Sequence, residues 1–368
     1  MPGPAASPLS GPRRSGPAVV ALLAAASALL LAAAPGVAAA APTSAAGAFA
    51  SPVPATPPAS TQTLCRFTDP RLPEVSGLVV TGDKLLAIND GGDRLTVYVL
   101  DRACQVVGVR TAPVDPYDPE DMALAADGTV WLSDTGDNLA QRATVALLAL
   151  HPDGSTAIYR MTYPDGPHDA EALLLAPDGT PYVVTKEVLG NSGVYRPAAA
   201  LADGGTVPMT KVGALSFALT GTEGGPVGRA GELMVTGGAV SPDGRLVALR
   251  TYTDAYLWPL SGSDIPAALE TKPVRIPLPP APQGEAISFG TDSRELVVAG
   301  EGVPGDVTVV TPPAGLLPAA ATASTTATAT AAAAGGHAGV PTLTAAVIAA
   351  VTATLVVWLV GVFRRRRP

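Results

Sequence analysis

The stretch EDMALAADGTVWLSD, residues 120–134, contains an acidic residue, a short apolar run, Asp-Gly and a second apolar run. Two apolar runs around Asp-Gly predict a β-hairpin, because Gly accepts the positive φ that such a turn requires. The pattern occurs five times, and the copies start at Ser76, Glu120, Glu171, Thr236 and Glu285. Every copy has an Asp seven positions after its start, namely Asp83, Asp127, Asp178, Asp243 and Asp292. The hairpin is therefore a repeat unit.

The repeat predicts an all-β fold, a β-propeller over residues 63–312. The starts are separated by 44, 51, 65 and 49 residues, a period typical of propeller blades. Two more strand patterns follow the first hairpin at 144–151 and 155–163, which gives four strands per unit. Five blades are favoured; six remain open, because the longest interval contains the Gly-rich segment 221–231. The last unit lacks one strand, and TLCRFTDP (63–70) is expected to supply it and close the ring.

The N-terminal region has the pattern of an export signal. Arg13 and Arg14 precede the apolar segment 17–34, and small residues follow, which predicts a signal peptide over residues 1–41. Adjacent arginines also fit twin-Arg export, but Gly16-Pro17 replace the bulky apolar residues of that signal, so ordinary secretion is favoured. Residues 42–62 are rich in Pro, Ala, Ser and Thr and are expected to form a linker.

The C-terminal region predicts a membrane anchor. An Ala/Thr-rich stalk over 313–341 leads to residues 342–363, which are uncharged, mostly apolar and long enough to cross a bilayer. The basic tail 364–368 follows directly, and its arginines favour the cytoplasmic side. No LPxTG motif precedes the span, so attachment to a cell wall is not expected. We predict a single-pass protein of the cell membrane with its propeller outside.

The predicted outside domain is strongly acidic. All 31 Asp and Glu lie between Asp69 and Asp306, while six of the 23 Lys and Arg belong to the signal peptide or the tail. The remaining 17 basic residues leave this domain a net charge of −14, although the whole chain carries −8. Such a charge repels phosphate backbones and excludes nucleic acid as the expected partner.

Two cysteines, Cys65 and Cys104, lie in the exported part. Since export delivers them to an oxidising compartment, we expect a disulfide, with two separate thiols as the alternative. The bond would join the chain before the first repeat to the first blade.

The first strand of each propeller blade lines the central channel, so the first repeat position should face one mouth. Three of the five residues there are Glu120, Glu171 and Glu285, and the second strands end nearby at Asp90 and Asp134. Converging carboxylates repel one another, and a hard cation such as Ca²⁺ would offset that repulsion. Two alternatives are a solvated funnel, with some carboxylates paired to Lys186 and Arg250, and a catalytic carboxylate pair.

Two loops and one histidine add candidates. Residues 89–93 (NDGGD) and 133–138 (SDTGDN) carry Asp and Asn at positions that suit either Ca²⁺ binding or ordinary turns, and turns are slightly favoured. His168 and Asp169 lie close to the funnel as further binding candidates. A single His beside carboxylates is more often a hydrogen-bonded structural group than a ligand or an acid-base group.

A set of short motifs resembles a group of exported bacterial β-propellers that are mostly uncharacterised, and more distantly the esterase-like phytase and gluconolactonase-like propellers. The motifs are EVSGL (74–78), INDGGD (88–93), DPEDMAL (118–124), SDTGDN (133–138), YPDGPHDAEALL (163–174), VTKE (184–187) and QGEAISF (283–289). The resemblance implies an axial divalent cation and, in some relatives, lactone or ester hydrolysis. Glu171 matches the Glu of a gluconolactonase-like site, whereas the basic pocket of a phytase has no counterpart.

Two functions follow from these features. The first is a binding module for an extracellular ligand or protein, held outside the membrane, because no complete catalytic motif occurs. The alternative is a Ca²⁺-dependent hydrolase of a lactone, ester or glycan that uses the funnel carboxylates.

Overall fold

A computed structural model describes residues 59–313. The predicted signal peptide, most of the linker, all but the first residue of the stalk, the span 342–363 and the tail lie outside these residues. No helix within residues 59–313 is long and apolar enough to cross a membrane.

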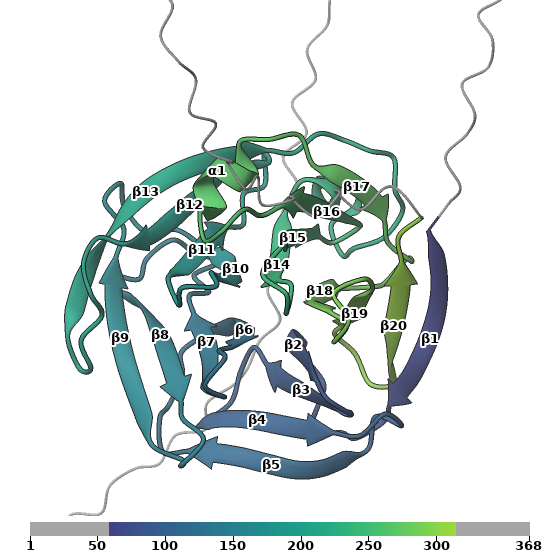
Figure 1. The fold of residues 1–368 in the computed structure, drawn as a ribbon, viewed down its shortest axis with the longest axis horizontal. Helices are drawn as coiled ribbons and strands as arrows, with labels where there is room; N and C mark the ends of the chain where they lie inside the picture. The colour runs from purple at the N-terminus through teal and green to yellow at the C-terminus, as the bar shows by residue number, and fades with distance from the viewer. Residues whose placement is uncertain (1–58, 314–368) are drawn as a thin grey trace, which may run out of the picture. The chain divides into compact units, whose positions relative to one another are not determined.

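The described chain is almost entirely β-sheet, which confirms the all-β propeller (Figure 1). One sheet contains β2 (Val75–Thr81), β3 (Lys84–Asn89), β4 (Leu95–Leu100) and β5 (Val106–Ala112). A second contains β14 (Val235–Val240), β15 (Leu246–Thr251), β16 (Asp254–Pro259) and β17 (Val274–Pro277). A third contains β18 (Gly284–Phe289), β19 (Leu296–Gly300), β20 (Gly305–Thr311) and β1 (Ser60–Phe67).

The fourth sheet has eight strands and consists of two antiparallel runs of four. The first run is β6 (Pro119–Leu124), β7 (Val130–Asp134), β8 (Val145–Leu150) and β9 (Thr156–Thr162). The second is β10 (Ala170–Leu175), β11 (Pro181–Thr185), β12 (Asn191–Pro197) and β13 (Thr206–Ser216). Their outer strands pair in parallel because the 11-residue β13 extends beyond its own hairpin and reaches β9.

Two short helices lie between strands, η1 (Gly228–Glu232) before β14 and α1 (Ile265–Leu269) after β16. The Gly-rich segment 221–231, which the structure describes in full, forms a loop with η1 and contributes no strand of its own. The long interval between the third and fourth repeats is therefore an insertion at the end of β13.

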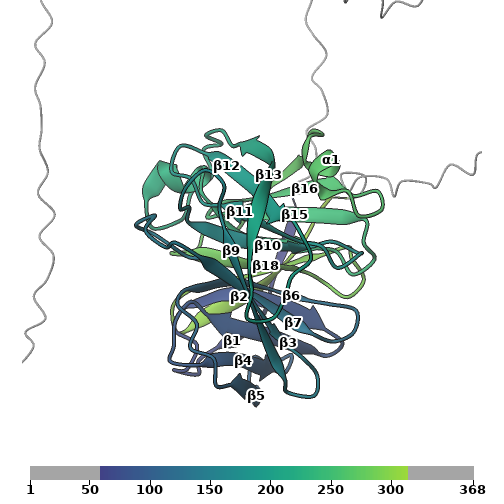
Figure 2. The same ribbon diagram turned by 90° about the vertical axis from the view of Figure 1, so that its left-hand side faces the viewer.

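The first strand of each repeat lies innermost, as the repeat predicts. Strands β2, β6, β10, β14 and β18 contact their neighbours around the centre, and Figure 2 shows β2, β6, β10 and β18 near the middle of the turned view. Apolar side chains fill the space between adjacent sheets; Ile88 and Leu132, for example, belong to one buried cluster between β3 and β7. Packing of sheet on sheet thus fixes the inner strands that carry the candidate site.

The repeated Asp has a structural role at the opposite ends of the inner hairpins. The carboxylates of Asp127, Asp178 and Asp292 each accept the backbone N–H two residues later at 2.9 Å. Such turns let the side chain replace a backbone acceptor, which explains why Asp recurs at this position.

The N-terminal strand closes the ring, as expected. Ser60 of β1 pairs with Thr311 of β20, so the last three residues of the predicted linker 42–62 belong instead to a strand. The linker boundary was wrong because the backbone of these polar residues finds hydrogen-bonding partners on β20. The Cys65–Cys104 disulfide is confirmed, with Cα atoms 5.6 Å apart, and it joins β1 to the segment between β4 and β5.

Candidate functional site

All five first repeat positions lie at a β-bulge. The strand pairing shifts at Ser76, Glu120, Glu171 and Thr236, and between Gly284 and Ile287, the interval that contains Glu285. A bulge inserts an extra residue into a strand and changes the direction of its side chain. The five inner strands begin at the mouth where the second strands end. The bulges therefore explain how one repeat position supplies side chains to one mouth of the propeller.

The carboxylates at this mouth form one group around a single lysine, and we call them the axial cluster. Oxygens of Glu120, Asp169 and Glu171 lie within 4.8 Å of one another. Glu285 lies close enough to affect the charge of both Glu120 and Glu171. The full set is Glu74, Asp90, Asp118, Glu120, Asp169, Glu171, Glu285 and Glu301, with Lys186.

The cluster becomes more exposed from its base to its edge. Glu120, Glu171 and Glu285 have 5%, 2% and 4% of their surface exposed. Most of the remaining carboxylates are half-buried, and Glu74 is exposed. The arrangement is a funnel with its most buried acids at the bulges.

Glu171 is the centre of the cluster. Its Oε1 accepts a hydrogen bond from the ammonium of Lys186, which also lies 5.4 Å from the ring centre of Tyr252. Its Oε2 is buried and has no hydrogen-bond partner. A buried carboxylate oxygen without a partner is costly, so this atom is suited to a ligand.

Burial dominates the electrostatics of the funnel. Desolvation, together with the neighbouring Glu301, raises the pKa of Glu285 to about 8. Burial also raises the pKa of Asp90 to about 7 and that of Asp118 to about 6, with nearby acids adding to both shifts. The pKa of Glu120 lies well above its ordinary value because of burial and the charge of Glu171. The cluster therefore holds protons near neutral pH unless a cation replaces them.

Lys186 remains charged within this cluster. Burial opposes its charge, but the carboxylate of Glu171 outweighs burial and raises the pKa of the ammonium. The expected pairing of Lys186 with a funnel carboxylate is present. One ammonium compensates only part of the charge of so many acids.

Arg250 does not pair with a funnel carboxylate, which corrects the expectation from the sequence. Its Nη1 donates to the backbone oxygens of Ala286 and Ala299, both at 2.7 Å, so the side chain joins β15 to β18 and β19. A Cβ on Gly284 would collide with the guanidinium, which explains a glycine there. Burial lowers the pKa of Arg250 to about 10, partly opposed by Glu285. Arg250 is a buried structural cation.

Asp134 holds a loop at the mouth. It accepts the backbone N–H groups of Tyr117 and Asp118, and Arg142 donates to it at 3.0 Å. Asp137 accepts backbone N–H groups of the following loop as well. In loop 133–138 these acids therefore act as turn residues, the alternative favoured from the sequence.

His168 also has a structural environment. Its Nε2 lies 3.1 Å from Asp165 and 3.2 Å from the hydroxyl of Tyr195, and its Nδ1 lies 3.4 Å from Glu187. The neighbouring Asp169 instead belongs to the axial cluster and accepts the backbone N–H of Asp137 at 2.8 Å.

Sequence reasoning did not select Asp118, which is close to Asp90, Asp169 and Asp134 in the funnel. Asp118 precedes Glu120 by two positions, just as Asp169 precedes Glu171. In extended chain, residues two apart lie on the same side. An Asp-x-Glu pattern at two repeat starts was therefore the available signal.

Gly136 allows these acids to come close together. A Cβ at this position would collide with the carboxylates of Glu120 and Asp118. The glycine in SDTGDN therefore provides space for the funnel rather than for a metal-binding turn.

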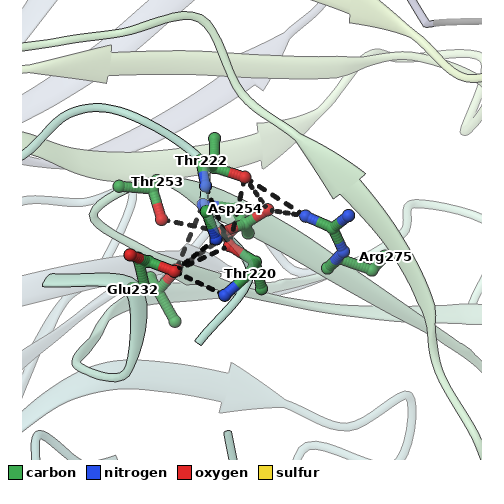
Figure 3. A network of polar contacts seen from close by, with 8 residues as sticks. Thr220, Thr222, Glu232, Thr253, Asp254 and Arg275 are labelled. Carbon is green, nitrogen blue, oxygen red and sulfur yellow. Dashed lines mark hydrogen bonds and ion pairs between the residues drawn. The ribbon is translucent and has the colours of Figure 1, made fainter. Parts of the chain in front are cut away.

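The insertion before β14 is fixed by hydrogen bonds and ion pairs around two buried acids, Glu232 and Asp254, which we call the insertion network (Figure 3). Its members are Thr220, Thr222, Glu232, Thr253, Asp254 and Arg275. Asp254 is fully buried and accepts hydrogen bonds from three threonine hydroxyls and from Arg275 at 2.6–2.9 Å. Glu232 accepts the backbone N–H of Gly221 at 2.6 Å.

The fixed insertion also supports the residue beside Lys186. Cβ atoms placed on Gly225 and Gly231 would lie 2.8 and 3.3 Å from the Cβ of Tyr252. The insertion backbone thus packs directly on Tyr252, whose ring lies next to the Lys186 ammonium. This contact links the insertion network to the axial cluster.

Comparison with solved structures finds propellers at low identity. A protein described as a putative gluconolactonase is 16% identical, with a TM-score of 0.37, and the match covers 62% of this chain and 70% of that one. A gluconolactonase from Xanthomonas campestris is 17% identical, with a TM-score of 0.38, over 64% and 71% of the two chains. The PQQ-bound aldose sugar dehydrogenase of Streptomyces coelicolor is 12% identical, with a TM-score of 0.37, over 70% and 99%.

These neighbours include gluconolactonases, the distant resemblance expected from the motifs. Their similarity is too low to transfer an activity. No protein-family model matches the sequence, and no curated protein matches it.

Proposed function

We propose that this chain is an exported, five-bladed propeller that binds a divalent cation in the axial cluster and serves as an extracellular binding module. The observation that carries the proposal is the unpartnered Oε2 of buried Glu171, beside oxygens of Glu120 and Asp169 within 4.8 Å. An all-oxygen donor set of this kind suits Ca²⁺, which prefers carboxylates and water.

Three residues would hold the ion, namely Glu120, Asp169 and Glu171, and Asp118 lies close to them. Since Ca²⁺ takes six to eight oxygen ligands, water would complete its shell. Bound there, the ion would displace protons from these acids and compensate the charge of the resulting carboxylates. Lys186 already holds one oxygen of Glu171 and leaves the other available.

The location outside the membrane is part of the proposal. It rests on the signal-like segment 1–41, the apolar segment 342–363 and the arginines after it. Protease treatment of intact cells should remove the propeller from the cell surface, while a cytoplasmic control protein remains intact. Protection of the propeller in intact cells would contradict this topology.

A second candidate is a hydrolase of a lactone, ester or glycan. It is favoured by carboxyl groups of different pKa in one funnel, about 8 for Glu285 and about 6 for Asp118. One would donate a proton while another accepts one, as general acid-base catalysis requires. For a lactone or an ester, the same bound ion would polarise the substrate carbonyl.

The test is the melting temperature of the full chain after chelation, with and without added Ca²⁺. An ion at about 100 times its Kd adds roughly 2.7 kcal/mol, or about 5–10 °C in a domain of this size. The shift should disappear in Glu171→Gln and persist in Asp178→Asn, a turn carboxylate far from the funnel. An equal shift in both variants, or none with Ca²⁺, Mg²⁺ or Mn²⁺, would overturn the cation site.

A further variant separates the two functions. Glu285→Gln should abolish turnover of a lactone or ester in a hydrolase, because it removes the carboxyl group that holds a proton at neutral pH. If the wild-type protein binds Ca²⁺ yet turns over none of these substrates, the binding module is supported.

A further inference from the structure

Exposed apolar side chains are concentrated at the mouth of the funnel. Within residues 59–313, nine large apolar side chains are exposed, and two of them, Val107 and Val109, lie on the outermost strand β5. The other seven lie in loops at the mouth and form what we call the apolar rim: Tyr117, Leu139, Val188, Leu189, Leu219, Val227 and Val303. A concentration of this kind on one face marks an interaction surface.

The rim alternates with acids of the axial cluster. Tyr117 directly precedes Asp118, and Val303 follows Glu301 by two positions. Both acids are half-buried at the edge of the funnel. The face therefore combines large apolar groups with a negative centre.

The rim is held in place rather than loosely displayed. Leu189 is 80% exposed, yet the next residue, Gly190, donates to Glu187 and accepts the N–H of Phe217, both at 2.9 Å. Leu219 directly precedes Thr220 of the insertion network. Arg142 lies 4.5 Å from the ring centre of Tyr117. Loops whose backbone is already fixed lose little conformational freedom when a partner binds them.

We propose that this face binds a segment of a partner protein in which a Lys or Arg lies between large apolar residues. The apolar residues would pack on the rim, and the basic side chain would enter the funnel at Asp90 and Glu301. Charge complementarity supports this partner, because the cluster has eight carboxylates and one lysine. The inference rests on the proposed binding module, with the inner acids left for the ion.

The experiment is a selection of displayed random peptides against the full chain in lipid nanodiscs with Ca²⁺. Enriched peptides should carry Lys or Arg flanked by apolar residues, and their affinity should fall as salt rises. Leu189→Ser with Leu219→Ser should weaken their binding about tenfold or more, the effect of losing a buried leucine. Val107→Ser with Val109→Ser is the matched control and should leave binding unchanged.

Several outcomes would overturn the proposal. These are no enriched peptide, enriched peptides without basic residues, or equal binding to the rim variant and to the β5 control. Rim-dependent binding to vesicles of phosphatidylcholine and phosphatidylglycerol, without peptide binding, would instead make this a membrane-binding face. Unchanged melting temperatures in the chelated state would show that both variants are folded.

The rise in melting temperature on adding Ca²⁺ distinguishes a failure of this inference from a failure of the proposed function. The rim variant should keep the full shift, since its substitutions lie outside the inner acids. A shift without any peptide binding would refute only the partner, and rim-dependent peptide binding without a shift would refute only the ion.

Discussion

The axial cluster and the insertion network both bury carboxylates at the same mouth, but they satisfy them differently. In the network, Asp254 accepts four hydrogen bonds, and Glu232 has a lowered pKa because Gly221 and Thr220 donate backbone N–H groups to it. In the cluster, Glu171 keeps one buried oxygen unpartnered and Glu120 has a strongly raised pKa. Satisfied acids stabilise a loop, whereas unsatisfied acids are available to a ligand.

The largest expected effect is on the insertion network. Asp254→Ala should lower the free energy of unfolding by about 3 kcal/mol, because it leaves three threonine hydroxyls and Arg275 without their acceptor. Urea unfolding would measure this loss, with Asp178→Ala at an exposed turn as the control, expected to change stability by less than about 1 kcal/mol. If Asp254→Ala lowers the free energy of unfolding no more than Asp178→Ala does, the hydrogen bonds of Asp254 do not stabilise the fold, and the contrast with the axial cluster fails.

The pH dependence should have the opposite sign to that of a salt-bridged acid. The pKa of Glu285 is about 8 in the folded protein, above its ordinary value of 4.5. Its folded state therefore holds a proton that the unfolded chain releases. The associated stability is complete below about pH 4.5 and is lost as the pH rises to about 8.

In chelator, stability should thus fall by on the order of 2 kcal/mol between pH 5 and pH 8, because the folded protein keeps the Glu285 proton over a range in which the unfolded chain has released it. Melting curves across this range would measure the decrease, and Glu285→Gln should flatten it. Added Ca²⁺ should restore stability more at pH 8 than at pH 5. Stability that rises with pH in chelator would contradict raised pKa values in the funnel.

The smallest expected effect is a gain in stability. Glu120→Gln should raise the free energy of unfolding in chelator by on the order of 1 kcal/mol, because folding no longer has to protonate a carboxyl group whose charge is disfavoured by burial and by Glu171. The same variant should lose the response to Ca²⁺. Thermal unfolding with and without the ion would show both changes. A variant less stable than wild type in chelator would indicate that Glu120 makes favourable interactions in the folded protein without the ion.

The repeat predicts the architecture and the inward-facing residues from the sequence. Glu120, Glu171 and Glu285 were found because a repeat shows which positions are equivalent, even though the bulge that turns them is not visible in the sequence. The closing strand and the disulfide were also predictable, from an incomplete last unit and from two cysteines in the part of the chain expected to be exported.

The directions of long side chains were not predictable. Arg250 lies inside β15 and bonds to backbone oxygens, whereas Lys186 directly follows β11 and bonds to Glu171. The direction of Arg250 depends on local packing, because Gly284 leaves room for its guanidinium. Asp118 was missed for another reason, because the Asp-x-Glu pattern occurs in only two of the five repeats.

The closing strand also determines how the propeller responds to mechanical force. Ser60 pairs with Thr311 at one end of the β1–β20 pair, so a pull between residues 59 and 313 would separate the strands one hydrogen bond at a time rather than shear them together. The Cys65–Cys104 bond lies within this path and transfers the load to the first sheet. Peeling from Ser60 would therefore stop at Cys65, and an oxidised protein would keep residues 65–67 of β1 attached under a force that detaches the whole strand in the reduced one.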